Sequence, residues 1–220
     1  RIARNAATLR AYQDNAYAQR YLALVSRVRA LEAQLFPDQP LALTEAVAFN
    51  YFKLLAYKDE YEVARLYSNG EFVRQLQAQF DGDYRLQFHL APSWLSKRDP
   101  RTGELRKRSF GPWMLSAFGL LARFKFLRGT RFDPFGYSHE RHLERQLIAG
   151  YEADVELIAQ RLDAAKRHSA LALARIPERI RGYGHIKDQA LLAVTRQAED
   201  LRRTLRDENV DQSTLYVAAA

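Results

Sequence analysis

The sequence predicts a mainly α-helical fold, a multi-helix domain with one small antiparallel β-hairpin at about residues 84–110. Two observations favour this class. Long stretches of the 220 residues contain no Gly or Pro and place apolar side chains three or four positions apart, which is the period of an α-helix. One short stretch instead alternates apolar and polar side chains, which is the period of a half-buried β-strand.

The helical pattern begins in residues 1–36, where Tyr and aliphatic side chains form one stripe that must be buried against something. A second helix is expected over residues 44–68, with Thr44 as its N-cap and Asn69-Gly70 as its stop. The polar residues Lys58-Asp59-Glu60 predict a kink within it. Further helices are expected at about 71–80, 113–128, 139–162, 166–176 and 186–206.

The segment 113–128 differs from the other predicted helices because it is apolar on most sides. Gly111-Pro112 opens it, since Pro is tolerated in the first turn of a helix, and Gly129 ends it. If only one face of a helix with apolar residues all round were buried, its other apolar side chains would remain exposed to water. We therefore expect this helix to lie in the centre of the core or in an interface.

The predicted hairpin follows the turn residues Asp81-Gly82-Asp83. Its first strand is the alternating segment 84–90, which Pro92 ends. Asp99-Pro100-Arg101-Thr102-Gly103 has the composition of a turn, and a second strand is expected at about 105–110.

The pair Pro37 and Pro40 ends the first helix and suggests a boundary. We predict that residues 1–40 are a connector helix from a preceding domain, that residues 41–206 form an α-rich C-terminal domain, and that residues 207–220 are a frayed tail. Because Arg1 begins within a helical pattern, we expect the chain to be a piece of a longer protein.

Composition excludes several classes of site within this chain. It contains no Cys, so it can form no disulfide, thiolate-held iron–sulfur cluster or Cys-ligated zinc site. No apolar run approaches the roughly 18 residues that a membrane helix needs, so we predict no membrane contact.

The positive charge is concentrated in one segment. The chain has a formal net charge of +8. Residues 97–131 hold ten basic and two acidic residues, so this segment alone accounts for the whole net charge of the chain. A local positive field suits an acidic protein, a phosphate group or a nucleic acid, whereas the plain alternative is a solvated loop. The predicted partner-docking residues are Lys97, Arg98, Arg101, Arg106, Lys107, Arg108, Arg123, Lys125, Arg128 and Arg131.

The sequence gives little evidence for a catalytic or metal-binding motif. His139 and His142 lie three residues apart on a predicted helix, but the His-Glu-x-x-His pattern is absent, so a solvated helix start is favoured over a metal site. Gly182-Tyr183-Gly184-His185 resembles part of a phosphate loop without the preceding strand, so a joint between helices is favoured. We predict no catalytic residue and no metal ligand.

Several separated blocks of the sequence resemble the C-terminal region of the bacterial indolepyruvate ferredoxin oxidoreductase family. The likeness extends over about residues 45–190. The blocks are Lys58–Tyr67, Gly70–Phe72, Phe80–Tyr84, Phe88–Pro92, Phe110–Met114, Phe132–Tyr137 and Pro177–His185.

This resemblance implies a fused 2-oxoacid:ferredoxin oxidoreductase, which oxidatively decarboxylates aryl pyruvates to acyl-CoA. Such an enzyme uses thiamine diphosphate, magnesium, iron–sulfur clusters and CoA, and it passes electrons to ferredoxin. The family's cofactor motifs are absent from this chain, so the resemblance implies no cofactor and no catalytic residue here.

We therefore expect an accessory C-terminal domain, cytoplasmic and inactive as the isolated chain. Its partners are the other domains of the parent oxidoreductase and, through the basic segment, ferredoxin or CoA. The alternative is a basic helical domain that binds nucleic acid, although no known nucleic-acid-binding motif is present. A third hypothesis is a small self-sufficient enzyme, which only the five His residues suggest.

Overall fold

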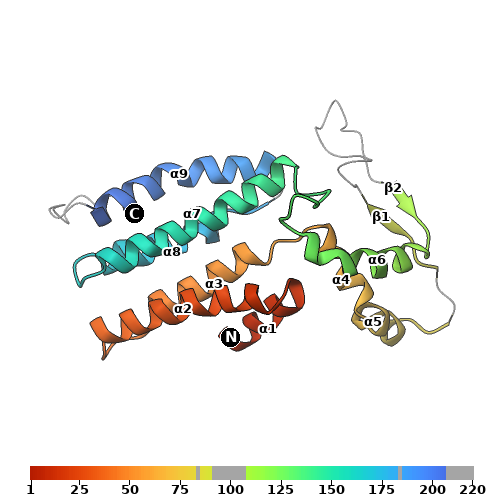
Figure 1. Ribbon diagram of the computed structural model, residues 1–220, viewed down its shortest axis with the longest axis horizontal. Helices are drawn as coiled ribbons and strands as arrows, with labels where there is room; N and C mark the ends of the chain where they lie inside the picture. Colours follow the sequence, from red (N-terminus) through yellow and green to blue (C-terminus); the bar gives the residue numbers. More distant parts are fainter. Residues whose placement is uncertain (83–84, 91–107, 183–184, 207–220) are drawn as a thin grey trace. The chain divides into compact units, whose positions relative to one another are not determined.

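The computed structural model describes residues 1–82, 85–90, 108–182 and 185–206. Within these residues the chain forms nine α-helices, one short 3-10 helix and one two-stranded antiparallel sheet. Figure 1 labels the α-helices and the strands. This confirms the predicted mainly α class with a small hairpin. The chain divides into two compact units. We call Arg1–Tyr57 with Gly136–Ala220 the bundle, and Lys58–Phe135 the insert.

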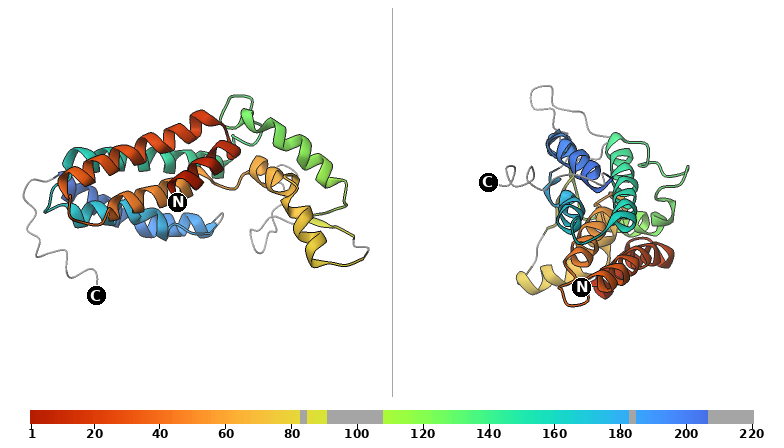
Figure 2. Two further views of the ribbon diagram at one scale, coloured as in Figure 1. Left: turned by 90° about the horizontal axis from the view of Figure 1, so that it is seen from below. Right: turned by 90° about the vertical axis from the view of Figure 1, so that its left-hand side faces the viewer.

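The described part of the bundle contains six helices. They run side by side (Figure 1 and Figure 2). Helix α3 packs against α2, α7 and α8, and α9 packs against α7 and α8. One continuous apolar core joins all six, with Leu9, Val25, Leu55, Val155 and Leu173 almost fully buried. The helices are α1 Ile2–Tyr12, α2 Asn15–Leu35, α3 Ala42–Leu55, α7 His139–Arg161, α8 Arg167–Arg179 and α9 His185–Arg206.

Residues 1–40 do not behave as a connector within the described structure. Helices α1 and α2 pack on each other and on α3, and Leu9 and Tyr21 are fully buried in the bundle core. The stripe predicted on residues 1–36 thus finds its partner inside the same unit. The boundary between units lies instead after Tyr57 and again after Phe135.

The beginning of α3 corrects the predicted N-cap. The helix begins at Ala42, so Thr44 is its third residue and makes no cap of its own. Glu32 of α2 takes that role from a distance: its carboxylate accepts the backbone N–H of Leu43 at 2.9 Å and of Thr44 at 2.7 Å. The Thr44 hydroxyl also donates to it at 2.7 Å. A fully buried carboxylate therefore satisfies the free N–H groups that every helix start presents.

Three stacked tyrosines cross the bundle from α2 through α3 to α7. The ring centroids of Tyr21 and Tyr51 lie 6.0 Å apart at 22°, and those of Tyr51 and Tyr151 lie 6.1 Å apart at 23°. Each hydroxyl has an acceptor. Tyr21 donates to the Ala48 carbonyl and Tyr151 to the Ala174 carbonyl, each at 3.0 Å, and Tyr51 donates to Glu152. The stack thus combines a large apolar area with satisfied polar ends.

Alkaline pH is expected to unfold the bundle through these tyrosines. Burial raises the pKa of Tyr21, Tyr51 and Tyr151 above the ordinary value of 10.0, so the folded chain keeps phenols protonated that the unfolded chain ionises. Their contribution to stability is complete below pH 10 and is lost as the pH rises beyond it. The part of the tyrosinate absorbance that comes from these three buried tyrosines should appear together with the loss of helical circular dichroism, in one steep step. Ionisation of the buried tyrosines with helicity intact would contradict this.

The insert is built from α4 Glu60–Ser68, α5 Glu71–Gln79, β1 Phe88–Leu90, β2 Arg108–Phe110, α6 Met114–Arg123 and the 3-10 helix η1 Phe124–Leu127. Its small core centres on Ala64, Phe88 and Phe118, and Tyr67 stacks on Phe118 at 5.3 Å. The strands pair with Phe88 opposite Phe110. The predicted turn at 99–103 lies outside the described residues.

Three predicted helices are divided in the structure, and the helix expected over residues 1–36 is α1 followed by α2. The helix expected over 44–68 ends at Leu55, and a new helix begins at Glu60 because the Asp59 carboxylate accepts the Glu62 N–H at 2.8 Å. The polar residues 58–60 therefore mark a complete break between the bundle and the insert, not a kink. Similarly, the helix expected over 113–128 is α6 followed by the tighter turns of η1.

Candidate docking surface

Half of the predicted docking residues can be placed. Arg108 lies on β2, Arg123 ends α6, Lys125 lies in η1, and Arg128 and Arg131 follow it. The other five, Lys97, Arg98, Arg101, Arg106 and Lys107, lie outside the described residues. Of the residues that can be placed, Arg108, Arg123 and Arg131 are exposed and Lys125 is half-buried.

Arg128 departs from the predicted surface because it is buried. Its Nη2 donates to Asp59 Oδ1 at 2.9 Å, and its Nε donates to the other carboxylate oxygen. The side chains of Arg128 and Asp59 are only 5% and 3% exposed, and the guanidinium also lies 5.5 Å over the ring of Tyr61. The charge of Arg128 is therefore balanced inside the insert, so this residue ties η1 to the start of α4 and does not face a partner.

A second buried carboxylate shapes the loop after η1. Asp133 accepts the backbone N–H of Gly129 at 3.0 Å and of Phe135 at 3.1 Å, and the Tyr61 hydroxyl donates to it at 3.1 Å. Burial, followed by the nearby Asp133 carboxylate, raises the pKa of Tyr61, so this phenol remains a donor. Asp59 and Asp133 together fix the segment that carries Arg131.

Helix α6 is apolar on two faces. Its inner face, with Met114, Phe118 and Leu121, packs in the core of the insert. The opposite face carries Trp113 and Leu120, which lie two helical turns apart and are 61% and 59% exposed. The structure thus explains why residues 113–128 are apolar on most sides: one side forms core, and the other is an uncovered apolar stripe.

The uncovered stripe continues into η1 and the loop beyond it. Phe124 and Phe126 are exposed with ring centroids 6.0 Å apart, and Phe132 is 72% exposed with Arg131 over its ring at 5.6 Å. Exposed aromatic side chains next to arginines are the composition of protein-interface hot spots. We define the docking surface as Trp113, Leu120, Arg123, Phe124, Phe126, Arg131 and Phe132.

Sequence reasoning found the arginines of this surface but not its aromatic residues. A run of charge is visible without a structure, whereas the exposure of Trp113 or Phe126 depends on which side of α6 meets β1 and α4. The only available signal was the all-round apolarity of 113–128, which left core and interface as equal alternatives. In the structure one face of the helix lies in the core of the insert and the opposite face is exposed.

The histidines form no metal site in the described residues, where no group of three or more His, Asp or Glu side chains converges. His139 Nε2 lies 4.0 Å from Asp188 Oδ1 at the surface, and His142 is exposed. His89 and Ser109 face each other across the hairpin, with Nδ1 and Oγ 3.0 Å apart. Gly182 has φ +92°, as expected for a joint between helices, while residues 183–184 lie outside the described part.

Among the described residues, no helix has the length and apolarity that a membrane span requires.

Comparison with known proteins gives one family. A model described as a family of unknown function, DUF6537, matches residues 1–200, which include the whole insert and nearly all of the bundle. No curated protein and no solved structure matches the sequence.

Proposed function

The chain belongs to the DUF6537 family, and from this premise we propose that it is the accessory C-terminal domain of a thiamine-diphosphate-dependent indolepyruvate (2-oxoacid):ferredoxin oxidoreductase. The bundle is its structural part. The insert carries the docking surface, and its partner is an acidic ferredoxin. The reactive cofactors belong to other domains of the parent enzyme, so the chain itself performs no catalytic step.

The first support comes from the roles of residues within the resembling blocks. Block 58–67 contains Asp59, Tyr61 and the bidentate pair of Arg65 with Glu62, and block 132–137 contains Asp133. These side chains are engaged in buried or half-buried contacts of the insert. Such residues maintain a framework, as an accessory domain requires.

A block in the bundle has the same framework character. Block 177–185 begins at the end of α8, where Lys53 of α3 donates to the carbonyls of Pro177 and Ile180, the latter at 3.0 Å. Burial, assisted by Arg181 and Lys187, lowers the pKa of Lys53. The ammonium closes the C-terminal end of α8, where free carbonyl groups attract a cation.

The single observation that carries the docking role is the exposed aromatic and basic surface of the insert. Burial of its apolar stripe beneath a partner would stabilise the complex, and its arginines carry a charge complementary to that of an acidic protein. CoA offers phosphates but too little surface to cover a stripe that extends over two turns of α6 and beyond. A protein partner is therefore favoured.

Arg123→Glu should weaken ferredoxin binding about tenfold at low salt, because the reversed charge faces an acidic partner. Leu120→Ser should weaken it by a similar factor and do so at low and high salt alike, because this contact is apolar. The measurement is a titration of the 220-residue chain with ferredoxin. Arg161→Glu, at the exposed end of α7, makes the same change of charge on the bundle and should leave the affinity within about twofold.

Other outcomes reject the docking role. Absence of ferredoxin binding at low salt rejects it, as does an equal loss for Arg161→Glu and Arg123→Glu. A gel shift with mixed DNA and RNA that Arg123→Glu abolishes would establish the nucleic-acid alternative. Binding of CoA, but not of ferredoxin, would replace the partner.

The parent enzyme is tested independently of docking. The reading frame upstream of Arg1 is expected to encode thiamine diphosphate and Cys motifs on the same polypeptide. An upstream sequence without them would overturn the assignment to the oxidoreductase.

A further inference from the structure

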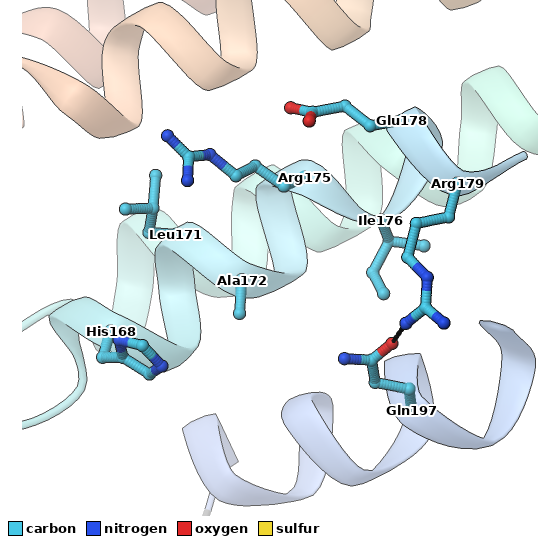
Figure 3. Close-up of a pocket in the computed structure, with 8 residues that line it drawn as sticks. All are labelled: His168, Leu171, Ala172, Arg175, Ile176, Glu178, Arg179 and Gln197. Carbon is cyan, nitrogen blue, oxygen red and sulfur yellow. Dashed lines mark hydrogen bonds between the residues drawn. The ribbon is translucent and has the colours of Figure 1, made fainter. Parts of the chain in front are cut away.

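The bundle has a groove of about 300 Å³ over α8 that the proposed function does not use. Figure 3 shows its lining. Seven of the eight residues lie on α8, and Gln197 lies on α9. The volume is at the lower limit of small-molecule sites. The groove is lined by His168, Leu171, Ala172, Arg175, Ile176, Glu178, Arg179 and Gln197.

The charge in this groove is only partly balanced. Within the described residues, the guanidinium of Arg175 makes no hydrogen bond or ion pair, and neither does the imidazole of His168. Arg179, one turn after Arg175, donates to no described residue other than Gln197, whose amide is neutral. Glu178 is the one acidic residue of the lining, and its Oε1 accepts the amide of the fully buried Asn50 at 3.1 Å.

The orientation of these side chains leaves room for a ligand between them. In Figure 3, Arg175 leans back along α8 to Leu171, while Arg179 turns to Gln197 on α9. Leu171 lies beside the end of Arg175, while Ala172 and Ile176 point to the side of α8 that faces α9 (Figure 3). Leu171 and Ala172 are half-buried, and Ile176 is 8% exposed. The groove therefore offers an apolar floor with a cationic group at its rim.

We propose that this groove binds a small organic phosphate, with the phosphate group on Arg175 and the apolar body on Leu171, Ala172 and Ile176. Arginine matches phosphate geometry with two parallel N–H donors, and the resulting charge-assisted bonds are stronger than neutral ones. The field of Arg179 adds to the attraction. A dianion gains more from this field than the single charge of a carboxylate, which is why a phosphate is favoured.

Phenyl phosphate is the probe that tests the assignment, because it combines a phosphate with a flat apolar ring. Titration of the 220-residue chain by calorimetry at low salt is expected to show saturable binding with one site. Arg175→Gln should weaken binding at least about tenfold and Arg179→Gln about threefold, since only Arg175 contacts the phosphate directly. Arg175→Lys should lie between wild type and Arg175→Gln, because it keeps the charge but loses the paired donors.

The matched control is Arg161→Gln, which removes an exposed arginine from α7 of the same unit and should leave the affinity within about twofold. Benzoate and inorganic phosphate complete the test, and each should bind more weakly than phenyl phosphate. Failure of phenyl phosphate to bind overturns the proposal, as does an equal loss for Arg161→Gln and Arg175→Gln. Equal affinity for inorganic phosphate overturns the role of the apolar floor, and tighter binding of benzoate overturns the choice of a phosphate.

Discussion

Arg128→Met is expected to unfold the insert while the bundle keeps its own unfolding transition. The change removes one member of a buried ion pair and leaves the Asp59 carboxylate, which is 3% exposed, without its cation. Breaking such a pair costs about 3–5 kcal/mol, because an uncompensated charge remains in a dry environment. The insert has a small core centred on Ala64, Phe88 and Phe118. A loss of this size therefore exceeds the free energy of unfolding that so small a core provides.

Denaturation followed by hydrogen exchange, resolved to α4 and α6 on one side and α3 and α8 on the other, separates the two units. Arg74→Met is the control, since it breaks the exposed pair with Glu71 in the same unit and should leave protection unchanged. The double variant Asp59→Asn with Arg128→Met should recover part of the loss, because the Asn still caps α4 and no charge is left buried. Full protection of α6 in the single variant would refute the role assigned to this pair.

Glu32→Ala is expected to destabilise the bundle by about 4 kcal/mol and to leave the insert intact. The carboxylate is fully buried and accepts three hydrogen bonds at the start of α3, from the N–H groups of Leu43 and Thr44 and from the Thr44 hydroxyl. Without it, two helix N–H groups lose their partners in the interior. Each hydrogen bond to a charged group contributes about 1.5–3 kcal/mol, and the start of a helix favours a negative charge.

Chemical denaturation monitored by circular dichroism measures this loss. Glu32→Gln should recover less than half of it, because the amide keeps one acceptor oxygen but presents an NH₂ group to a helix N–H. Glu45→Ala is the control: it removes an exposed carboxylate from the first turn of the same helix and should cost well under about 1 kcal/mol. An equal cost for Glu32→Ala and Glu45→Ala would show that the capping geometry carries no special weight.

The caps of α7 and α3 show how much of the fold the sequence could predict. Ser138 precedes its helix directly and caps it by accepting the Arg141 N–H at 3.3 Å, so here the capping residue is the local one that N-cap preferences favour. Thr44 has the same chemistry, yet α3 begins two residues before it, because the acceptor for this helix comes from Glu32 on α2. A local rule fails where a tertiary contact supplies the cap.

The candidate surface was predictable to a similar degree. The excess of arginine in residues 97–131 marks the insert without any structure. Which arginine is buried cannot be inferred from that excess, since the burial of Arg128 depends on Asp59, 69 positions earlier in the chain. The same holds for residues 1–36. Tyr21 and Val28 belong to a stripe that the sequence predicts to be buried, but only the structure shows that the surface covering it is α3.

The order of segments has a consequence for protein synthesis. The insert is continuous in sequence, whereas the core of the bundle joins helices that come before Tyr57 with helices that come after Gly136. A nascent polypeptide leaves the ribosome N-terminus first, and domains generally fold as units. The insert can therefore reach its final state while α1, α2 and α3 still wait for α7, α8 and α9 to be translated, and the apolar surfaces of those three early helices are the part most exposed to chaperones during that interval.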